Sequence, residues 1–151
     1  NRGAIVSGLD FGELHEVFEM RSALEGLAIR VAVAKISERQ LAALERMLDE
    51  MDDYRDESAE WVRLHRAFHE YLCSLSGRPR LMKQISALYS LIEAPMRLWL
   101  QHSEKPLSAR QEHAVILDAI RSGDVDRAEA IVREHIEGTV PALIQFLQSE
   151  K

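Results

Sequence analysis

Cysteine, long apolar runs and clusters of basic residues are scarce or missing in this sequence of 151 residues. The single cysteine, Cys73, excludes an intramolecular disulfide framework and fits a reducing compartment, so we expect a cytoplasmic protein. No apolar run approaches the roughly 20 residues that cross a bilayer, and no signal-peptide pattern opens the chain. The net charge is −6 without any basic run, so this segment by itself is not expected to bind nucleic acid.

Glycine and proline are also few, seven and four residues respectively, and the stretches between them have helical periodicity. No stretch alternates apolar and polar residues for long enough to predict a sheet. Ser37 with Gln40 predicts a capping box, Ser108 predicts another helix start, and Pro95 and Pro141 predict bends. The sequence thus favours an all-α fold, an antiparallel bundle of about six helices, over residues 11–36, 38–54, 58–75, 80–102, 108–122 and 126–148.

Four histidines fall on the apolar faces of three expected helices. His65 and His69 in HRAFH are four residues apart, so both imidazoles lie on one helix face, one turn apart. His113 and His135 each continue the apolar line of a later helix. A lone inward histidine is usually a neutral core residue, but four would leave several buried nitrogens that need partners. The residues alone leave two alternatives: a buried metal site, or separate core histidines.

The donor types narrow the choice of metal and of chemistry. An all-nitrogen set without a thiolate suits zinc, nickel, cobalt or iron better than magnesium or calcium. The HRAFH segment is not the zinc-protease motif, because Arg66 stands where that motif needs a glutamate to act as base. His15 and His102 lie near helix ends and are expected at the surface.

Three segments carry a resemblance to a known family: EMRSALEGLAIRVAVAKIS (19–37), HRAFHEYLCSLSGRPRL (65–81) and EHAVILDAIRSGDVDRAEAIVREHI (112–136). They resemble the opening helix, the third helix and the closing helices of the FCD domain. This is the C-terminal effector domain in the FadR branch of GntR-type bacterial transcription regulators, and six helices suggest its shorter, VanR-like subgroup. The segment NRGAIV resembles the last wing strand of a winged-helix domain. We therefore expect residues 1–10 to be the tail of a missing N-terminal domain, and residues 11–151 to form the helical effector-binding domain.

The resemblance implies a metal site at His65, His69, His113 and His135, although the family usually has aspartate at the first of these positions. With imidazole there, the ligand set is neutral, which favours zinc and then nickel over manganese. It is open whether His65 replaces the aspartate as a ligand, and whether the metal is structural or contacts the effector.

The resemblance also implies that a small carboxylate effector binds beside the metal. Arg21 is the best candidate to receive that carboxylate, because a guanidinium matches its geometry. The alternative for Arg21 is an ion pair with Glu25, four residues on. Arg97 and Gln101 are weaker candidates for the same pocket.

Taken together, these features predict the ligand-sensing and homodimerising half of a transcription regulator that is not an enzyme. The missing N-terminal domain, and not this segment, would bind operator DNA. Two alternatives stay open: a metal-dependent hydrolase on a helical bundle, and a structural interaction module whose histidines fill the core. A hydrolase needs a general base near the metal, and no carboxylate has a suitable helical spacing from the histidines.

Overall fold

Local signals at the helix ends set the boundaries of this all-helical fold. The computed structural model describes residues 8–102 and 109–149. Within them lie seven helices and no strand: α1 (Phe11–Val33), α2 (Glu38–Asp53), α3 (Ser58–Ser74), α4 (Pro79–His102), α5 (Ala109–Ser122), α6 (Val125–Glu137) and α7 (Thr139–Ser149). Most of the expected tail, residues 1–7, and the expected cap Ser108 lie outside the described residues.

Side-chain caps explain where the first two helices start. The predicted capping box of α2 is confirmed: the Gln40 backbone N–H donates to Ser37 Oγ at 3.1 Å, and the Ser37 N–H donates to Gln40 Oε1 at 2.9 Å. Asp10 and Glu13 form the same arrangement at the start of α1, with distances of 2.7 and 3.1 Å. Both boxes satisfy backbone donors that the first helical turn leaves without partners.

The predicted sixth helix, 126–148, is divided at Gly138 into α6 and α7. The Gly138 N–H still donates to the Glu134 carbonyl at 2.8 Å, so α6 is regular up to this point. Pro141 has no N–H for the Glu137 carbonyl, and its ring would collide with that carbonyl in a continuous helix. The bend expected at Pro141 therefore falls three residues earlier, and the seventh element is part of the expected sixth helix.

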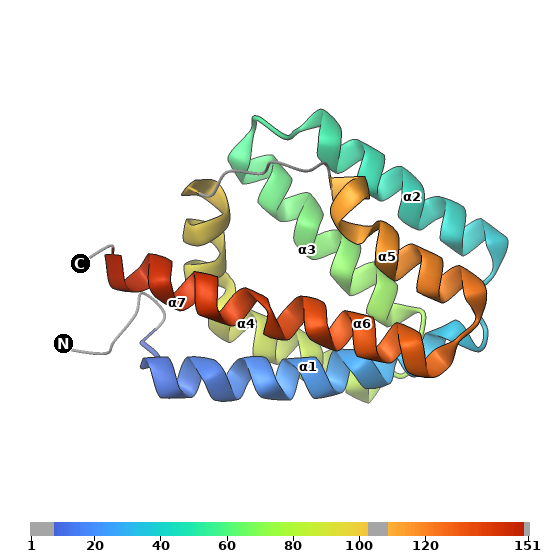
Figure 1. Ribbon diagram of the computed structural model, residues 1–151, viewed down its shortest axis with the longest axis horizontal. Coiled ribbons are helices and arrows are strands. Elements are labelled where there is room, and N and C mark those ends of the chain that lie inside the picture. Colours follow the sequence, from blue (N-terminus) through green and yellow to red (C-terminus); the bar gives the residue numbers. More distant parts are fainter. Residues whose placement is uncertain (1–7, 103–108, 150–151) are drawn as a thin grey trace.

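Pro95 lies inside α4 without ending it. The last part of α4 runs at a steep angle to its first part (Figure 1). Pro95 removes the backbone donor that would bond the Leu91 carbonyl, which is the usual cause of such a bend. The last turns of α4 thus face a different part of the bundle from its first turns.

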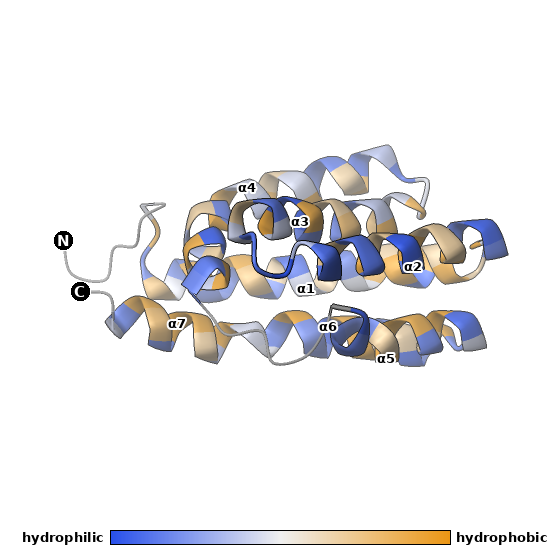
Figure 2. Ribbon diagram, turned by 90° about the horizontal axis from the view of Figure 1, so that it is seen from above, coloured by the Kyte–Doolittle hydropathy of each residue, from blue (hydrophilic) through white to orange (hydrophobic). Residues whose placement is uncertain are grey.

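The helices pack in two layers, with α5, α6 and α7 on one side of α1–α4 (Figure 2). α1 packs most extensively on α6, and short turns fold α2 onto α3, α3 onto α4, and α5 onto α6. Buried apolar side chains from all seven helices form one main core. Within the described ranges, no helix combines the length and the apolar character that crossing a membrane requires.

Candidate metal and ligand site

α3 places His65 and His69 on its buried face, as their spacing predicts. Both side chains are 7% exposed, and their Nε2 atoms are 3.2 Å apart. Trp61, one turn before His65, stacks on that imidazole with ring centroids 5.1 Å apart and an interplanar angle of 16°. The pair is therefore held between apolar core residues and the facing helices.

α5 brings a third imidazole to this pair. His113 is fully buried, and its ring lies 6.1 Å from that of His65 and 5.5 Å from that of His69, centroid to centroid. Each of the three residues offers a ring nitrogen, and these atoms all lie within 4.8 Å of one another. Side chains from two helices far apart in sequence thus converge on one point.

His135, from α6, lies beside this group. Its ring stacks on His69 with centroids 5.6 Å apart, and lies 5.0 Å from the ring of His113. Among the described residues, the set of ligand atoms within 4.8 Å of one another comprises His65, His69 and His113 but not His135. The structure brings all four expected histidines together, three of them at ligand spacing.

Burial keeps the imidazoles of His69 and His135 neutral. It lowers the pKa of His69 well below the ordinary value, and His65 and His113 lower it further. Burial is also the first cause that lowers the pKa of His135 to about 3, with His113 and Arg21 adding to the effect. A neutral imidazole is the form that coordinates a metal ion.

The donor set fits a divalent transition metal. Zinc–nitrogen bonds of about 2.0–2.1 Å in a tetrahedral site separate the ligand nitrogens by about 3.3 Å, and the nitrogens of His65 and His69 are 3.2 Å apart. A hydrogen bond in which one ring donates to the other satisfies this distance as well. The described geometry is compatible with a zinc-type site.

Arg21 reaches the same place from α1 and is paired with Glu25. The guanidinium Nε donates to Glu25 Oε2, and both side chains are 3% exposed. The other Glu25 oxygen accepts from the thiol of Cys73 at 3.6 Å. Burial raises the pKa of that thiol well above its ordinary value, so Cys73 is a packed thiol and not a reactive one. The guanidinium also lies 5.2 Å from the ring centroid of Tyr89.

One pocket of about 540 Å³ has walls from α1 and from α3–α7. Arg21 and the four histidines share it, so the ion-pair alternative for Arg21 holds while the side chain still faces the pocket. The other lining residues are Trp61, Met96, Trp99, Leu100, Gln111, Glu112, Val115, Ile136 and Thr139.

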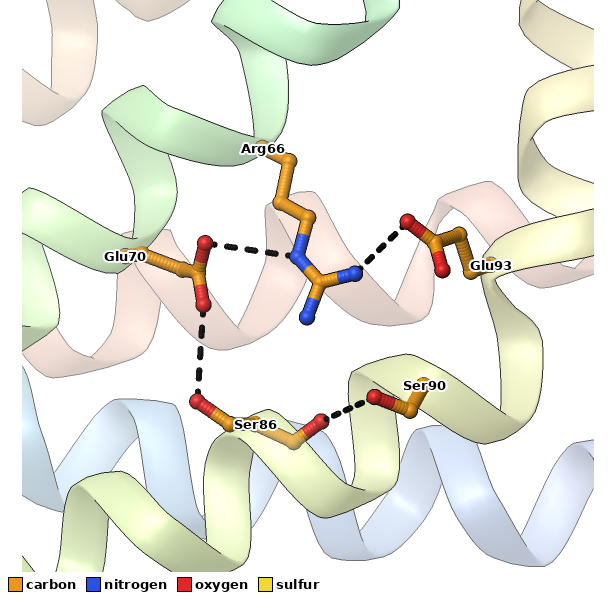
Figure 3. Close-up of polar contacts among 5 residues, drawn as sticks. All are labelled: Arg66, Glu70, Ser86, Ser90 and Glu93. Carbon is orange, nitrogen blue, oxygen red and sulfur yellow. Dashed lines mark hydrogen bonds and ion pairs between the residues drawn. The ribbon is translucent and has the colours of Figure 1, made fainter.

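The two remaining expected ligand contacts lie elsewhere. Arg97 lines a second pocket, of about 410 Å³, on the opposite side of α3, and Gln101 lines neither of these two pockets. In the second pocket Arg66 donates to Glu70 at 3.3 Å and to Glu93 at 2.7 Å, and Ser86 donates to Glu70 (Figure 3). Arg97 is thus on the side of an ion-pair network and not on the side of the histidines.

Sequence reasoning missed the apolar part of the histidine pocket. Met96, Trp99 and Leu100 lie beyond Pro95, where the helix direction cannot be read from periodicity. Helical spacing from the histidines also did not identify Glu112, which lines their pocket. Its position directly before His113 was the only available signal.

Comparison with known proteins agrees with this architecture. A family model described as the FCD domain matches residues 16–138. The chain is similar to BphR of Paraburkholderia xenovorans (strain LB400), described as an uncharacterized HTH-type transcriptional regulator, with 28% identity over 96% of this chain and 62% of BphR. It is 26% identical to the Nta operon transcriptional regulator of Aminobacter aminovorans, over 98% of this chain and 70% of that protein.

A third relative, the HTH-type transcriptional repressor NanR of Salmonella newport (strain SL254), is 29% identical over 78% of this chain and 46% of NanR. The solved structure of E. coli McbR/YncC has the same fold, with a TM-score of 0.77 at 20% identity over 87% of this chain and 68% of that one. The chain therefore spans only part of the length of the regulators that it resembles. Because the family match covers most of its residues, this protein belongs to the FCD domain family.

Proposed function

We propose that this protein is the ligand-sensing domain of a transcription regulator, and that it binds a divalent transition metal and a small carboxylate. The observation that carries this is the convergence of His65, His69 and His113 within 4.8 Å beside the Arg21 guanidinium in one pocket. His135, adjacent to them, would complete a four-nitrogen set. By ligand softness the proposed metal is zinc, with nickel next.

The metal would supply positive charge and open coordination positions for a carboxylate oxygen. The protein's own contribution is orientation and exclusion of water: α3, α5 and α6 hold the imidazoles, and the core around them keeps the dielectric low. Glu25 already neutralises Arg21, so an anionic ligand would share this guanidinium with Glu25 instead of finding an isolated charge.

A ligand can alter DNA binding only through its different affinity for two arrangements of the protein. We propose that operator DNA binds to a preceding domain, as the names of the HTH-type relatives suggest, and that two copies bind together. The net charge of −6 on this segment supports a DNA contact elsewhere. The VanR-like assignment also stays a proposal.

Metal analysis after dialysis tests the first step. We expect one zinc ion per chain in the protein, and strong loss of zinc in His69→Ala. His15→Ala is the matched control, since His15 is exposed on α1. A thermal-shift screen of small carboxylates with and without zinc then tests the second step. Substoichiometric metal would instead favour histidines that only fill the core.

Glu112 gives the hydrolase alternative one carboxylate in the pocket, although this residue is exposed in the first turn of α5. A metal-dependent hydrolase would use such a group as general base. We expect the zinc-loaded protein to leave simple esters and phosphates intact. Turnover that Glu112→Gln abolishes would favour the hydrolase.

A further inference from the structure

The histidine pocket has an apolar half that metal binding does not use. Met96, Trp99 and Leu100 line it from the last turns of α4. Their spacing of three and four residues places them on one helix face, and this face follows the bend at Pro95. Met96 and Leu100 are buried, and Trp99 is half-buried.

Two more apolar side chains extend this surface. Ile136 comes from α6, directly after the histidine of that helix, and Val115 comes from α5. Val115 is 50% exposed and is one of four large apolar residues with such exposure among the described residues. Both side chains lie in the same lining as the imidazoles, so polar and apolar groups meet in a single cavity.

The remaining polar lining residues do little to offset this apolar surface. Gln111 and Glu112 are exposed in the first turn of α5, which places them at the solvent side of the pocket. The Thr139 hydroxyl already donates to the carbonyl of His135 at 3.2 Å. Among the described lining residues, the imidazoles and the Arg21 guanidinium are therefore the polar groups of the pocket interior.

We propose that this pocket selects carboxylates whose body is a single aromatic or other apolar ring, over small hydrophilic acids. The inference rests on the proposed function, since it assigns the carboxylate to the histidine and Arg21 side. The ring would then pack against Trp99 and Met96, through aromatic and sulfur–aromatic contacts. A polyhydroxylated acid would place hydroxyl groups against apolar side chains and lose their hydrogen bonds to water.

The pocket volume agrees with this ligand class. About 540 Å³ falls within the range of roughly 300–1,000 Å³ that is usual for small-molecule sites. A one-ring acid fits such a space together with the hydration of its carboxylate. The polar half of the cavity would thus hold the carboxylate, and the apolar half would hold the ring.

Calorimetric titration of the zinc-loaded protein with benzoate, cyclohexanecarboxylate, acetate and gluconate tests the inference. We expect both ring acids to bind at least about tenfold more tightly than acetate, because the ring removes apolar area from water. Trp99→Ala should weaken benzoate binding by about tenfold and leave acetate binding within about twofold. Leu91→Ala is the matched control, since Leu91 is an exposed apolar residue of the same helix outside the pocket lining.

The outcomes distinguish failure of ring selection from failure of carboxylate sensing. Acetate or gluconate binding as tightly as benzoate overturns ring selection and leaves carboxylate sensing intact. No heat with any of the four acids overturns carboxylate sensing, and ring selection with it. If Trp99→Ala does not fold, Trp99→Phe and Met96→Ala replace it: the first should keep the preference for ring acids and the second should reduce it.

Discussion

Two faces of α3 carry side-chain pairs with the same spacing and opposite chemistry. His65 and His69 face the core, where other helices add further imidazoles. Arg66 and Glu70, each one residue further on, form an ion pair that Glu93 of α4 extends, with the Arg66 guanidinium 4.7 Å from the Tyr89 ring centroid (Figure 3). An i,i+4 spacing on a helix therefore fixes only which residues are neighbours. The facing helices decide whether the pair meets further imidazoles, as His65 and His69 do, or further charged groups, as Arg66 and Glu70 do.

The largest expected difference between the two faces concerns metal-dependent stability. A metal at a thousandfold excess over its dissociation constant stabilises the folded protein by about 4 kcal/mol. His113→Ala should remove most of this increment, because it deletes one of the proposed ligands. The measurement is the melting temperature with and without zinc. Arg66→Gln should retain the full zinc-induced shift, and an undiminished shift in His113→Ala would contradict the metal site.

The next largest loss in the free energy of unfolding is expected when the buried Arg21–Glu25 ion pair is broken. Glu25→Gln leaves the Arg21 charge buried without its carboxylate, and breaking such a pair costs about 3 kcal/mol or more. Glu93→Gln makes the same chemical change on a partner that is 44% exposed, and should cost less than about 1 kcal/mol. Urea denaturation of both variants measures the free energies of unfolding. Equal losses would show that burial does not distinguish the two pairs.

In the metal-free protein, lowering the pH should reduce the free energy of unfolding first through the buried histidines and only later through the Arg66 ion pairs. The pKa of His135 falls from 6.5 to about 3 on folding, so the unfolded chain binds more protons between these values. Stability therefore rises with pH across this window and is lost as the pH falls below 6.5, at roughly 1 kcal/mol per pH unit for one such histidine.

Urea denaturation of the metal-free protein at several pH values between 5 and 8 measures this slope, and His135→Gln should make it shallower. A slope unchanged by this substitution would mean that His135 does not stay neutral in the folded protein.

The smallest effect is expected for the Arg66 network. Arg66 is 23% exposed, and its two glutamate partners are more exposed still. Arg66→Gln should therefore lower the free energy of unfolding by no more than about 1 kcal/mol, less at high salt, and leave zinc affinity within about twofold. Denaturation at low and high salt, together with a zinc titration, measures both quantities. A large loss of zinc affinity would show that the two faces of α3 are coupled.

Helix content was predictable because its determinants are local. The Ser37–Gln40 box and the apolar periodicity place α2 within one residue of its expected end, and α3 and α4 also agree within one residue. The first helix, expected to reach residue 36, ends three residues earlier at Val33. The division at Gly138 was displaced from the expected bend because Pro141 affects the carbonyl one turn before it.

The sequence predicted which residues of each single helix face inward, but not how the helices bring them together. Periodicity points each histidine inward, but the distance between helices depends on packing, which no single helix encodes. Met96 and Arg97 illustrate the limit: they are consecutive, so they point about 100° apart, and they line different pockets. Which of the two side chains faces the histidines depends on the direction of α4 after Pro95.

Both tryptophans of this chain, Trp61 and Trp99, line the histidine pocket. The protein's tryptophan fluorescence, excited selectively over that of tyrosine, therefore originates at this cavity without any added label. The indole stacked on His65 should dim when that ring takes up a proton or a metal ion, because an electron-poor neighbour quenches the excited state. The indole on α4 should respond to whatever fills the apolar half, so a single spectrum can follow both events.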